Sequence, residues 1–286
     1  MSFIGVTTMD RMDAYRRFFA KLVTANAGVS ADSELAAAFA STPREQFVGK
    51  APWRVFTSTG YIDTPSDDPA FLYQDVVVSL GGKGPLNNGQ PSLHALCIAT
   101  LAPQKGETVV HVGAGTGYYT TLLAKLVGEA GKVIAYEIDA ELAQRAAGNL
   151  CGFSQVTVND RSGAEGPIPD CDILYVNAGA TSPLAVWLDA LRPNGRLLFP
   201  LTASDGAGAM LLLTRNERGS FAARFLCQVQ FVPCVGARDE ATAAKLAAAF
   251  RRGGWHQVKE LHRSNVPGES CWCSGSGWWL STNSGE

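Results

Sequence analysis

The chain has 286 residues, of which 46% are hydrophobic and 17% are charged, proportions typical of a globular protein with a sizeable core rather than of a disordered or fibrous chain. Its formal net charge is -2, so no excess of Lys and Arg is available to neutralise a nucleic-acid backbone, and we expect no nucleic-acid partner. No apolar run is long enough to span a bilayer, so we also expect no membrane partner.

The N-terminal region is predicted to be helical. The opening Met1 to Gly5 lacks the basic region and apolar core of a signal peptide, which predicts a cytoplasmic protein. A second helix is expected to begin after Ser30 or Asp32, either of which could be its N-cap. Apolar residues recur at helical spacing in both segments: Tyr15, Phe18, Phe19, Leu22 and Val23 in the first, and Leu35, Ala38 and Phe39 in the second.

A capping region is expected between Thr42 and about Leu86. This stretch is rich in Pro, Gly, Asp and aromatic residues, which are typical of turns and irregular structure. Within it, the run from Asp75 to Leu80 has the composition of a strand.

Beyond Pro103, short β-branched runs alternate with amphipathic helical ones, which predicts a parallel sheet covered by helices on both faces. Two later strands, Ala209 to Arg215 and Ala222 to Val232, are expected to form an antiparallel hairpin at the sheet edge. The other expected strands are Thr108 to Val112, Lys132 to Glu137, Gln155 to Val158, Ile173 to Asn177 and Arg196 to Leu201. The expected helices are Tyr118 to Val127, Ala140 to Leu150 and Pro183 to Leu191.

The tail begins with an alanine-rich helix, Ala241 to Phe250, followed by two expected strands, Gln257 to His262 and Cys271 to Ser281, joined by a Pro-Gly turn. It forms either an extra hairpin on the same sheet or a small lid. We expect its Trp residues, Trp272, Trp278 and Trp279, to pack partly on the core and partly to shape an acceptor cleft. The chain thus divides into a helical and cap region at 1–102, a core at 103–236 and an extension at 237–286. The first region includes the loop at 87–91, here called the acceptor loop.

The seven Cys residues are an odd number and lie in apolar stretches, as expected for reduced, buried thiols. Cys271 and Cys273 are separated by one residue and lack a nearby second pair of ligands. We therefore expect no metal site there.

The strongest motif is a buried strand that runs directly into a glycine-rich turn, His111-Val112-Gly113-Ala114-Gly115-Thr116-Gly117, which opens a helix. Such a turn can also serve only to pack a helix on a strand. Its G-x-G-x-G spacing differs from the G-x-G-x-x-G of dinucleotide-binding folds, so no pyrophosphate need be assumed. Glu137 ends the next strand and precedes Ile138, and a carboxylate there can accept hydrogen bonds from both ribose hydroxyls. The pattern therefore predicts a cofactor that carries a ribose.

Further polar groups follow the later strands. Asp160 and Arg161 lie where an adenine edge is expected, and Asn177 ends the fourth strand. Open α/β sheets bind ligands beyond the carboxyl ends of their parallel strands, so these side chains are also candidate cofactor ligands. Asp160 could equally be a residue of an Asx turn, and both roles stay open.

Five segments, in this order, resemble motifs of the protein-L-isoaspartate O-methyltransferase family: Pro43 to Val48, Gly89 to Pro91, Gly113 to Tyr119, Tyr175 to Ala180 and Phe231 to Pro233. The resemblance covers about two thirds of the chain. It implies an α/β fold with a Rossmann-like class I methyltransferase sheet, an N-terminal helical cap and, here, a C-terminal α/β extension. It also implies methyl transfer from S-adenosylmethionine to a carboxylate of a peptide or protein.

The active-site loop departs from the family. The family's loop carries Thr-Ile-Ser before Gln-Pro or Ala-Pro, and its Ser is implied in catalysis, whereas this chain reads Asn87-Asn88-Gly89-Gln90-Pro91. Asn87, Asn88 and Gln90 could orient a carboxylate through amide N–H groups, or Asn88-Gly89 could be only a turn. A carboxylate is ionised at neutral pH and needs no general base. Because the family's Ser is absent from this loop, we expect an acceptor other than isoaspartate.

Other functions remain as alternatives: a methyltransferase of a small molecule, or a protein that binds the cofactor without turnover. A nicotinamide oxidoreductase is disfavoured by the glycine spacing. A base-directed amino-methyltransferase would show Asn-Pro-Pro-aromatic where Asn177 to Ala180 stand. His94, His111, His256 and His262 are expected to be packing or surface residues. Neither the methyl acceptor nor the oligomeric state follows from the sequence.

Overall fold

The computed structural model describes residues 8–81 and 86–283. The chain forms two compact units, each built from several segments. The described residues of Met1–Gly106, Ala114–Gly131 and Glu141–Val156 form the first, here called the helical unit. Glu107–Gly113, Lys132–Ala140 and the described residues of Thr157–Glu286 form the second, here called the sheet unit.

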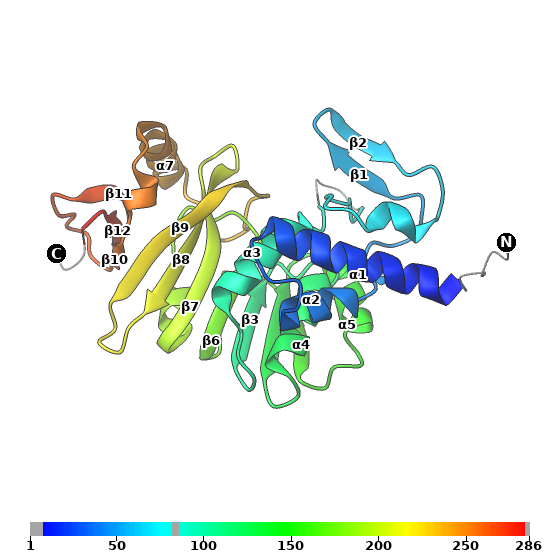
Figure 1. The fold of residues 1–286 in the computed structure, drawn as a ribbon. Coiled ribbons are helices and arrows are strands. Elements are labelled where there is room, and N and C mark those ends of the chain that lie inside the picture. Colours follow the sequence, from blue (N-terminus) through cyan, green and yellow to red (C-terminus); the bar gives the residue numbers. More distant parts are fainter. Residues whose placement is uncertain (1–7, 82–85, 284–286) are drawn as a thin grey trace. The chain divides into compact units, whose positions relative to one another are not determined.

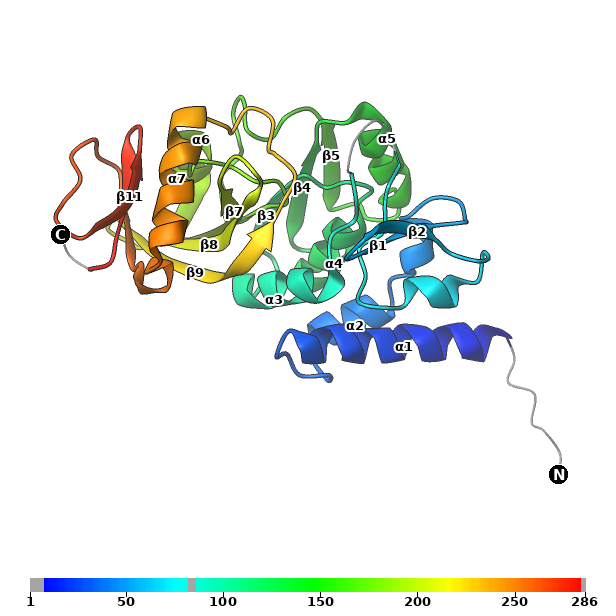
Figure 2. The same cartoon turned by 90° about the horizontal axis from the view of Figure 1, so that it is seen from above.

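The helical unit contains most of the helices (Figure 2). Helix α2 packs against both α1 and α4, and α1 also contacts α3. A small hairpin of two strands, β1 and β2, lies in the same unit. The elements are α1 (Thr8–Asn26), α2 (Glu34–Ala40), η1 (Arg44–Gln46), β1 (Arg54–Thr57), β2 (Gly60–Asp63), η2 (Pro69–Leu72), α3 (Pro91–Leu101), α4 (Tyr118–Val127) and α5 (Ala140–Asn149).

The first two helices are confirmed, with two corrections. The N-cap of α2 is Ser33, whose hydroxyl accepts the Ala36 N–H, and not Ser30 or Asp32. The Ser30 hydroxyl instead accepts the Asp32 N–H in the preceding turn. Phe18 is 65% exposed, because α1 buries only the side that carries Phe19 and Val23.

The run from Asp75 to Leu80 is not a regular strand, which corrects the prediction. Within the described part of the chain it makes only isolated bridges, Val55 with Val78 and Ser79 with Asn87. Helix α3 was not predicted. It begins at Pro91, whose fixed φ suits the first position of a helix.

Within the described residues, the sheet unit holds a ten-stranded sheet in the order β11-β12-β10-β9-β8-β7-β6-β3-β4-β5 (Figure 1). Strand β3 pairs in parallel with β4 and β6, and β6 with β7. From β7 to β9 the pairing is antiparallel, which confirms the predicted hairpin of β8 and β9. Its predicted place at the sheet edge is wrong, because β9 also pairs with β10. The strands are β3 (Thr108–Val112), β4 (Lys132–Glu137), β5 (Val156–Asp160), β6 (Cys171–Val176), β7 (Leu191–Thr202), β8 (Ala207–Arg215), β9 (Phe221–Gln230), β10 (Glu260–His262), β11 (Cys271–Gly275) and β12 (Trp278–Ser281).

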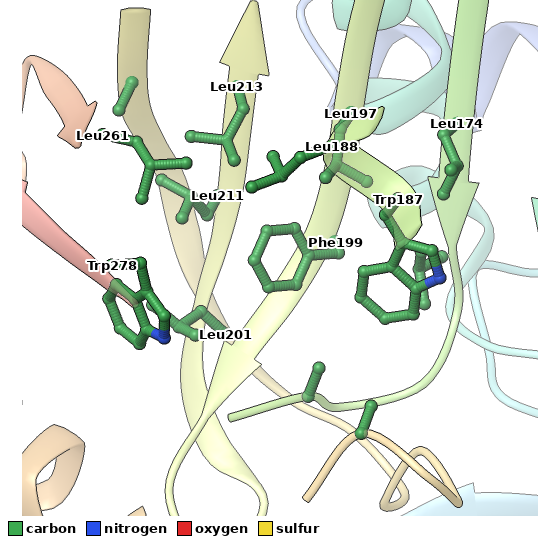
Figure 3. Packing of buried hydrophobic residues seen from close by; sticks show 14 of the residues in the cluster. Leu174, Trp187, Leu188, Leu197, Phe199, Leu201, Leu211, Leu213, Leu261 and Trp278 are labelled. Atoms are coloured by element: carbon green, nitrogen blue, oxygen red, sulfur yellow. The ribbon is translucent and has the colours of Figure 1, made fainter. Parts of the chain in front are cut away.

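One large core holds the sheet unit together. Helix α7 (Glu240–Arg252) contacts β7, β8 and β11, and the short α6 (Ala185–Ala190) contacts β7. Figure 3 shows Trp187 beside Phe199, and their rings meet edge to face at a centroid distance of 5.8 Å. Leucines of β7 and β8 extend this core toward Trp278 of the tail.

The tail joins the same sheet, which was the first of the two alternatives. Strand β10 pairs with β9 and with β12, and β11 pairs with β12. The predicted hairpin through the Pro-Gly turn is therefore wrong, since the tight turn lies at Gly277, with φ 77°. Trp272, Trp278 and Trp279 are 3–4% exposed, which confirms the packing that was predicted for them. Their contribution to an acceptor cleft stays a prediction.

Candidate functional site

The glycine-rich loop follows β3 and precedes α4, as predicted. Gly113, Gly115 and Gly117 all have positive φ, at 76°, 57° and 90°. A Cβ on Gly117 would lie 2.9 Å from Cδ1 of Leu150, the residue directly after α5, so a side chain at this position would collide with it. The loop is also held by the Asn149 side chain, which donates to the Thr116 carbonyl at 2.9 Å.

The sheet unit brings the ends of three parallel strands together. The Gly113 N–H donates to the Tyr136 carbonyl at 2.9 Å, and the Asn177 N–H donates to the Val112 carbonyl at 2.8 Å. A Cβ on Gly113 would lie 3.4 Å from the Asn177 carbonyl carbon. Three predicted ligands, Gly113, Glu137 and Asn177, therefore lie at the ends of neighbouring strands.

The imidazole of His111 is wholly buried and stacks on Tyr175, with ring centroids 5.5 Å apart. Burial lowers the pKa of His111 to about 3, so the ring is neutral. Its Nε2 lies 2.7 Å from Asn177 Nδ2 and accepts the amide N–H. Asn177 Oδ1 is buried and has no hydrogen-bond partner within the part of the chain that the structure describes. A buried acceptor of this kind suits a donor group of a ligand.

The burial of His111 predicts a pH dependence of stability. The unfolded chain binds a proton below about pH 6.5, whereas the folded protein binds it only near pH 3. The free energy of unfolding should therefore fall as the pH drops through this range, by up to about 1.4 kcal/mol per unit. Urea unfolding at pH 7, 6 and 5 measures this slope, and His111→Gln should lack its share. Equal slopes for the two proteins would contradict the prediction.

Glu137 ends β4 and is buried, with 8% of the residue exposed. One carboxylate oxygen accepts the Asp139 N–H at 3.0 Å, which fixes the side chain at the turn after the strand. The neighbouring Ile138 is 50% exposed. The two residues thus offer one buried carboxyl group and one exposed apolar side chain.

Arg161 stabilises the loop that follows β5, a role that the sequence did not predict. Its guanidinium donates to the Glu165 carbonyl at 2.7 Å and the Pro167 carbonyl at 3.0 Å, and it lies 4.6 Å from the Tyr136 ring centroid. It therefore ties the loop after β5 to β4. Asp160 is exposed at the end of β5.

In the helical unit, several side chains of the acceptor loop already make hydrogen bonds within the protein. Asn87 Oδ1 accepts the Gly89 N–H at 2.9 Å, so Asn87 forms the turn. Asn88 Oδ1 accepts the Val78 N–H at 2.8 Å, and its Nδ2 is buried without a partner among residues 8–81 and 86–283. The exposed Gln90 donates to Asp75 Oδ2 and Ser92 Oγ, both at 3.3 Å.

Sequence reasoning missed the role of Arg44, which lies in the first of the quoted motifs. Its fully buried guanidinium donates to the carbonyls of Leu72, Gln74 and Val76 at 2.5–2.8 Å. Burial lowers the pKa of Arg44. The side chain fixes the segment that leads to the acceptor loop, and a basic residue within an otherwise core-like motif was the available signal.

Two quoted motifs also meet within the sheet unit. Gly179 donates its N–H to the Val232 carbonyl at 2.7 Å, and Cys234 donates to the Gly179 carbonyl at 2.9 Å. Arg238 also binds this segment, since its guanidinium donates to the Gly179 carbonyl at 3.2 Å and to Thr202 Oγ1 at 2.7 Å. The segment at Gly179 is thus hydrogen-bonded to the segment at 232–238, although the two are distant in sequence.

The model of the Protein-L-isoaspartate(D-aspartate) O-methyltransferase family matches residues 18–239 of the chain. The chain belongs to this family. It is accordingly an S-adenosylmethionine-dependent methyltransferase, as predicted.

Individual members of the methyltransferase family support this result. A protein-L-isoaspartate O-methyltransferase 2 of Archaeoglobus fulgidus is 28% identical over 207 residues, which are 70% of this chain and 84% of the relative. A solved protein-L-isoaspartate O-methyltransferase matches 83% of this chain and 68% of its own, with TM-score 0.64 and 22% identity. A structure described as such an enzyme from Plasmodium falciparum, in complex with S-adenosyl-L-homocysteine, matches 77% of this chain and 98% of its own, with TM-score 0.61 and 18% identity.

These likenesses confirm the predicted class of fold, a mixed α/β structure of the class I methyltransferase type. No helix within the described ranges is both long and apolar enough to cross a membrane.

Proposed function

We propose that this enzyme methylates a carboxylate of a peptide or protein and that its acceptor differs from isoaspartate. The relatives' names support the carboxylate, since they are protein-L-isoaspartate O-methyltransferases. The proposal that the acceptor differs from isoaspartate rests on Gly89. This residue leaves the loop without a hydroxyl, and an added Cβ at its position would collide with His94.

For the cofactor, we assign the ribose hydroxyls to Glu137 and a donor group of the methionine part to Asn177 Oδ1. The buried carboxylate of Glu137 fits such donors, and so does Asn177 Oδ1, a buried acceptor that has no partner among the described residues. His111 orients Asn177 through its Nε2. The remaining assigned contacts are Gly113, Ala114, Gly115, Thr116 and Gly117 for close backbone approach, Ile138 for apolar contact, and Asp160 and Arg161 for the adenine edge.

The chemistry requires alignment rather than proton transfer. When bound, S-adenosylmethionine would supply a methyl group on its sulfonium. Transfer of this group to a carboxylate oxygen would break the S–CH3 bond, form the O–CH3 bond of a methyl ester and leave S-adenosylhomocysteine. The acceptor is already ionised at neutral pH, so no general base is needed. Asn88 Nδ2 is assigned to orient the carboxylate, with Asn87 and Gln90 holding the loop in shape.

The net charge of -2 supports a peptide or protein acceptor over nucleic acid. We place the enzyme in the cytoplasm on its thiol content alone.

A pair of synthetic peptides tests the proposed acceptor. The two share one sequence and contain either isoaspartate or normal aspartate at one position. We expect the unaltered enzyme to methylate the isoaspartyl peptide less than tenfold faster than the aspartyl peptide, because the interaction that the hydroxyl makes in the transition state is absent. Robust isoaspartate-selective transfer would show that the loop works without the hydroxyl.

A further inference from the structure

The space beside Gly89 is filled by an imidazole. Gly89 has φ +69°, and an ideal Cβ on it would lie 2.1 Å from His94 Nε2 and 2.8 Å from His94 Cδ2. These distances are far shorter than any real contact. The ring of His94 therefore stands where a side chain at position 89 would project.

The His94 ring is held firmly in this place. It is 2% exposed and stacks on Tyr119 with centroids 3.6 Å apart and planes 12° from parallel. The Tyr119 hydroxyl donates to the Gly89 carbonyl at 3.5 Å, which links the stack back to the loop. The first turn of α3 is fixed as well, since the Ser92 N–H donates to Asp75 Oδ1 at 2.9 Å. Moving the ring aside would break its stack on Tyr119.

The stack also connects two functional segments of the helical unit. His94 follows the acceptor loop in the first turn of α3, and Tyr119 lies in the first turn of α4, directly after the glycine-rich loop. A ring at this position is thus rigidly placed relative to the loop that orients the acceptor.

We propose that His94 determines the acceptor specificity of this enzyme by presenting its Nε2 in the place of the loop hydroxyl that Gly89 lacks. This rests on the proposed carboxyl methyltransferase function. An imidazole nitrogen forms a hydrogen bond as a hydroxyl does, but it lies on a larger and stiffer group. The carboxylate that fits it must therefore sit differently from one that fits a short Ser side chain.

The stack alone would be a purely structural role, and His94→Phe separates the two roles. Phenylalanine keeps a ring on Tyr119 and loses the nitrogen. We expect its melting temperature to stay within a few degrees and its affinity for S-adenosylhomocysteine to stay within about twofold. Its rate of base-labile methylation of an aged tryptic peptide mixture, which contains several kinds of carboxylate, should fall at least tenfold.

A compensating pair tests the shared space. Gly89→Ser alone should lower both the melting temperature and the activity, because its Cβ meets the imidazole. In Gly89→Ser with His94→Ala the collision is removed, so the melting temperature should recover relative to Gly89→Ser. This double variant should methylate the isoaspartyl peptide at least tenfold faster than His94→Ala does.

The outcomes separate the two claims. If the unaltered protein labels no carboxylate in the mixture, the proposed function fails and the role of His94 fails with it. If the unaltered protein labels carboxylates and His94→Phe does so at the same rate, only the role of His94 is overturned. A double variant no better on isoaspartate than His94→Ala would also overturn it.

Discussion

Removing the chain after Arg238 is expected to leave a protein that does not fold at 25 °C. The tail supplies a large part of the core of the sheet unit, and truncating one buried large side chain alone costs about 2–5 kcal/mol. Domains of this kind have about 5–15 kcal/mol of stability in total. The tail residues in this core are Leu246, Ala249, Val258, Leu261, Trp272, Cys273, Trp278 and Leu280.

The truncation also opens the edge of the sheet. The Ala223 N–H donates to the Lys259 carbonyl at 2.7 Å, and this bond would be lost along with the β9–β10 pairing. Circular dichroism and thermal melting of the truncated and full chains measure the effect. Trp278→Ala, at a 3% exposed position, should cost about 3–5 kcal/mol. Val266→Ala, at a 78% exposed position of the same tail, should change stability by less than about 0.5 kcal/mol. A truncated chain that melts like the full one would show that the tail is dispensable.

Replacing Glu137 by Ala is expected to weaken S-adenosylmethionine binding by about 1.5–3 kcal/mol, or roughly 10- to 150-fold. The reason is the loss of a nearly buried carboxylate that we assign to the ribose hydroxyls. Calorimetric titration measures the affinity, and Glu141→Ala, at an exposed position just beyond, is the matched control. Thermal melting of both variants is needed as well, because the Asp139 N–H also loses its acceptor. Unchanged affinity would remove Glu137 from the site.

The alternating core of the fold was readable from the sequence. The bounds of β3, β4 and α4 agree with the prediction, because glycines and a change of hydrophobic period mark where each begins and ends. Helix α3 escaped notice because it is apolar on most of its surface and has no amphipathic period. The pairing of the tail strands was also hidden, since which strands become neighbours depends on tertiary packing rather than on local pattern. The division at residues 102 and 236 stays a prediction.

The candidate site was readable to a smaller degree. The glycine-rich loop and the acid after the next strand follow from spacing alone. Two other features could not be predicted from the sequence and are visible only in the structure. Arg161 donates hydrogen bonds within its own loop, and the buried Arg44 donates to three backbone carbonyls. The same holds for Gly89, since only the structure reveals that the ring of His94 fills the space beside it.

The most direct test of the central claim is transfer of tritium from methyl-labelled S-adenosylmethionine to an aged peptide mixture by the unaltered protein. A methyl ester is hydrolysed by mild base, whereas a methyl group on nitrogen or carbon is not. We predict labelled peptides whose label is released as volatile methanol at alkaline pH. No transfer, or a label that survives base, would contradict the assignment of a carboxylate acceptor.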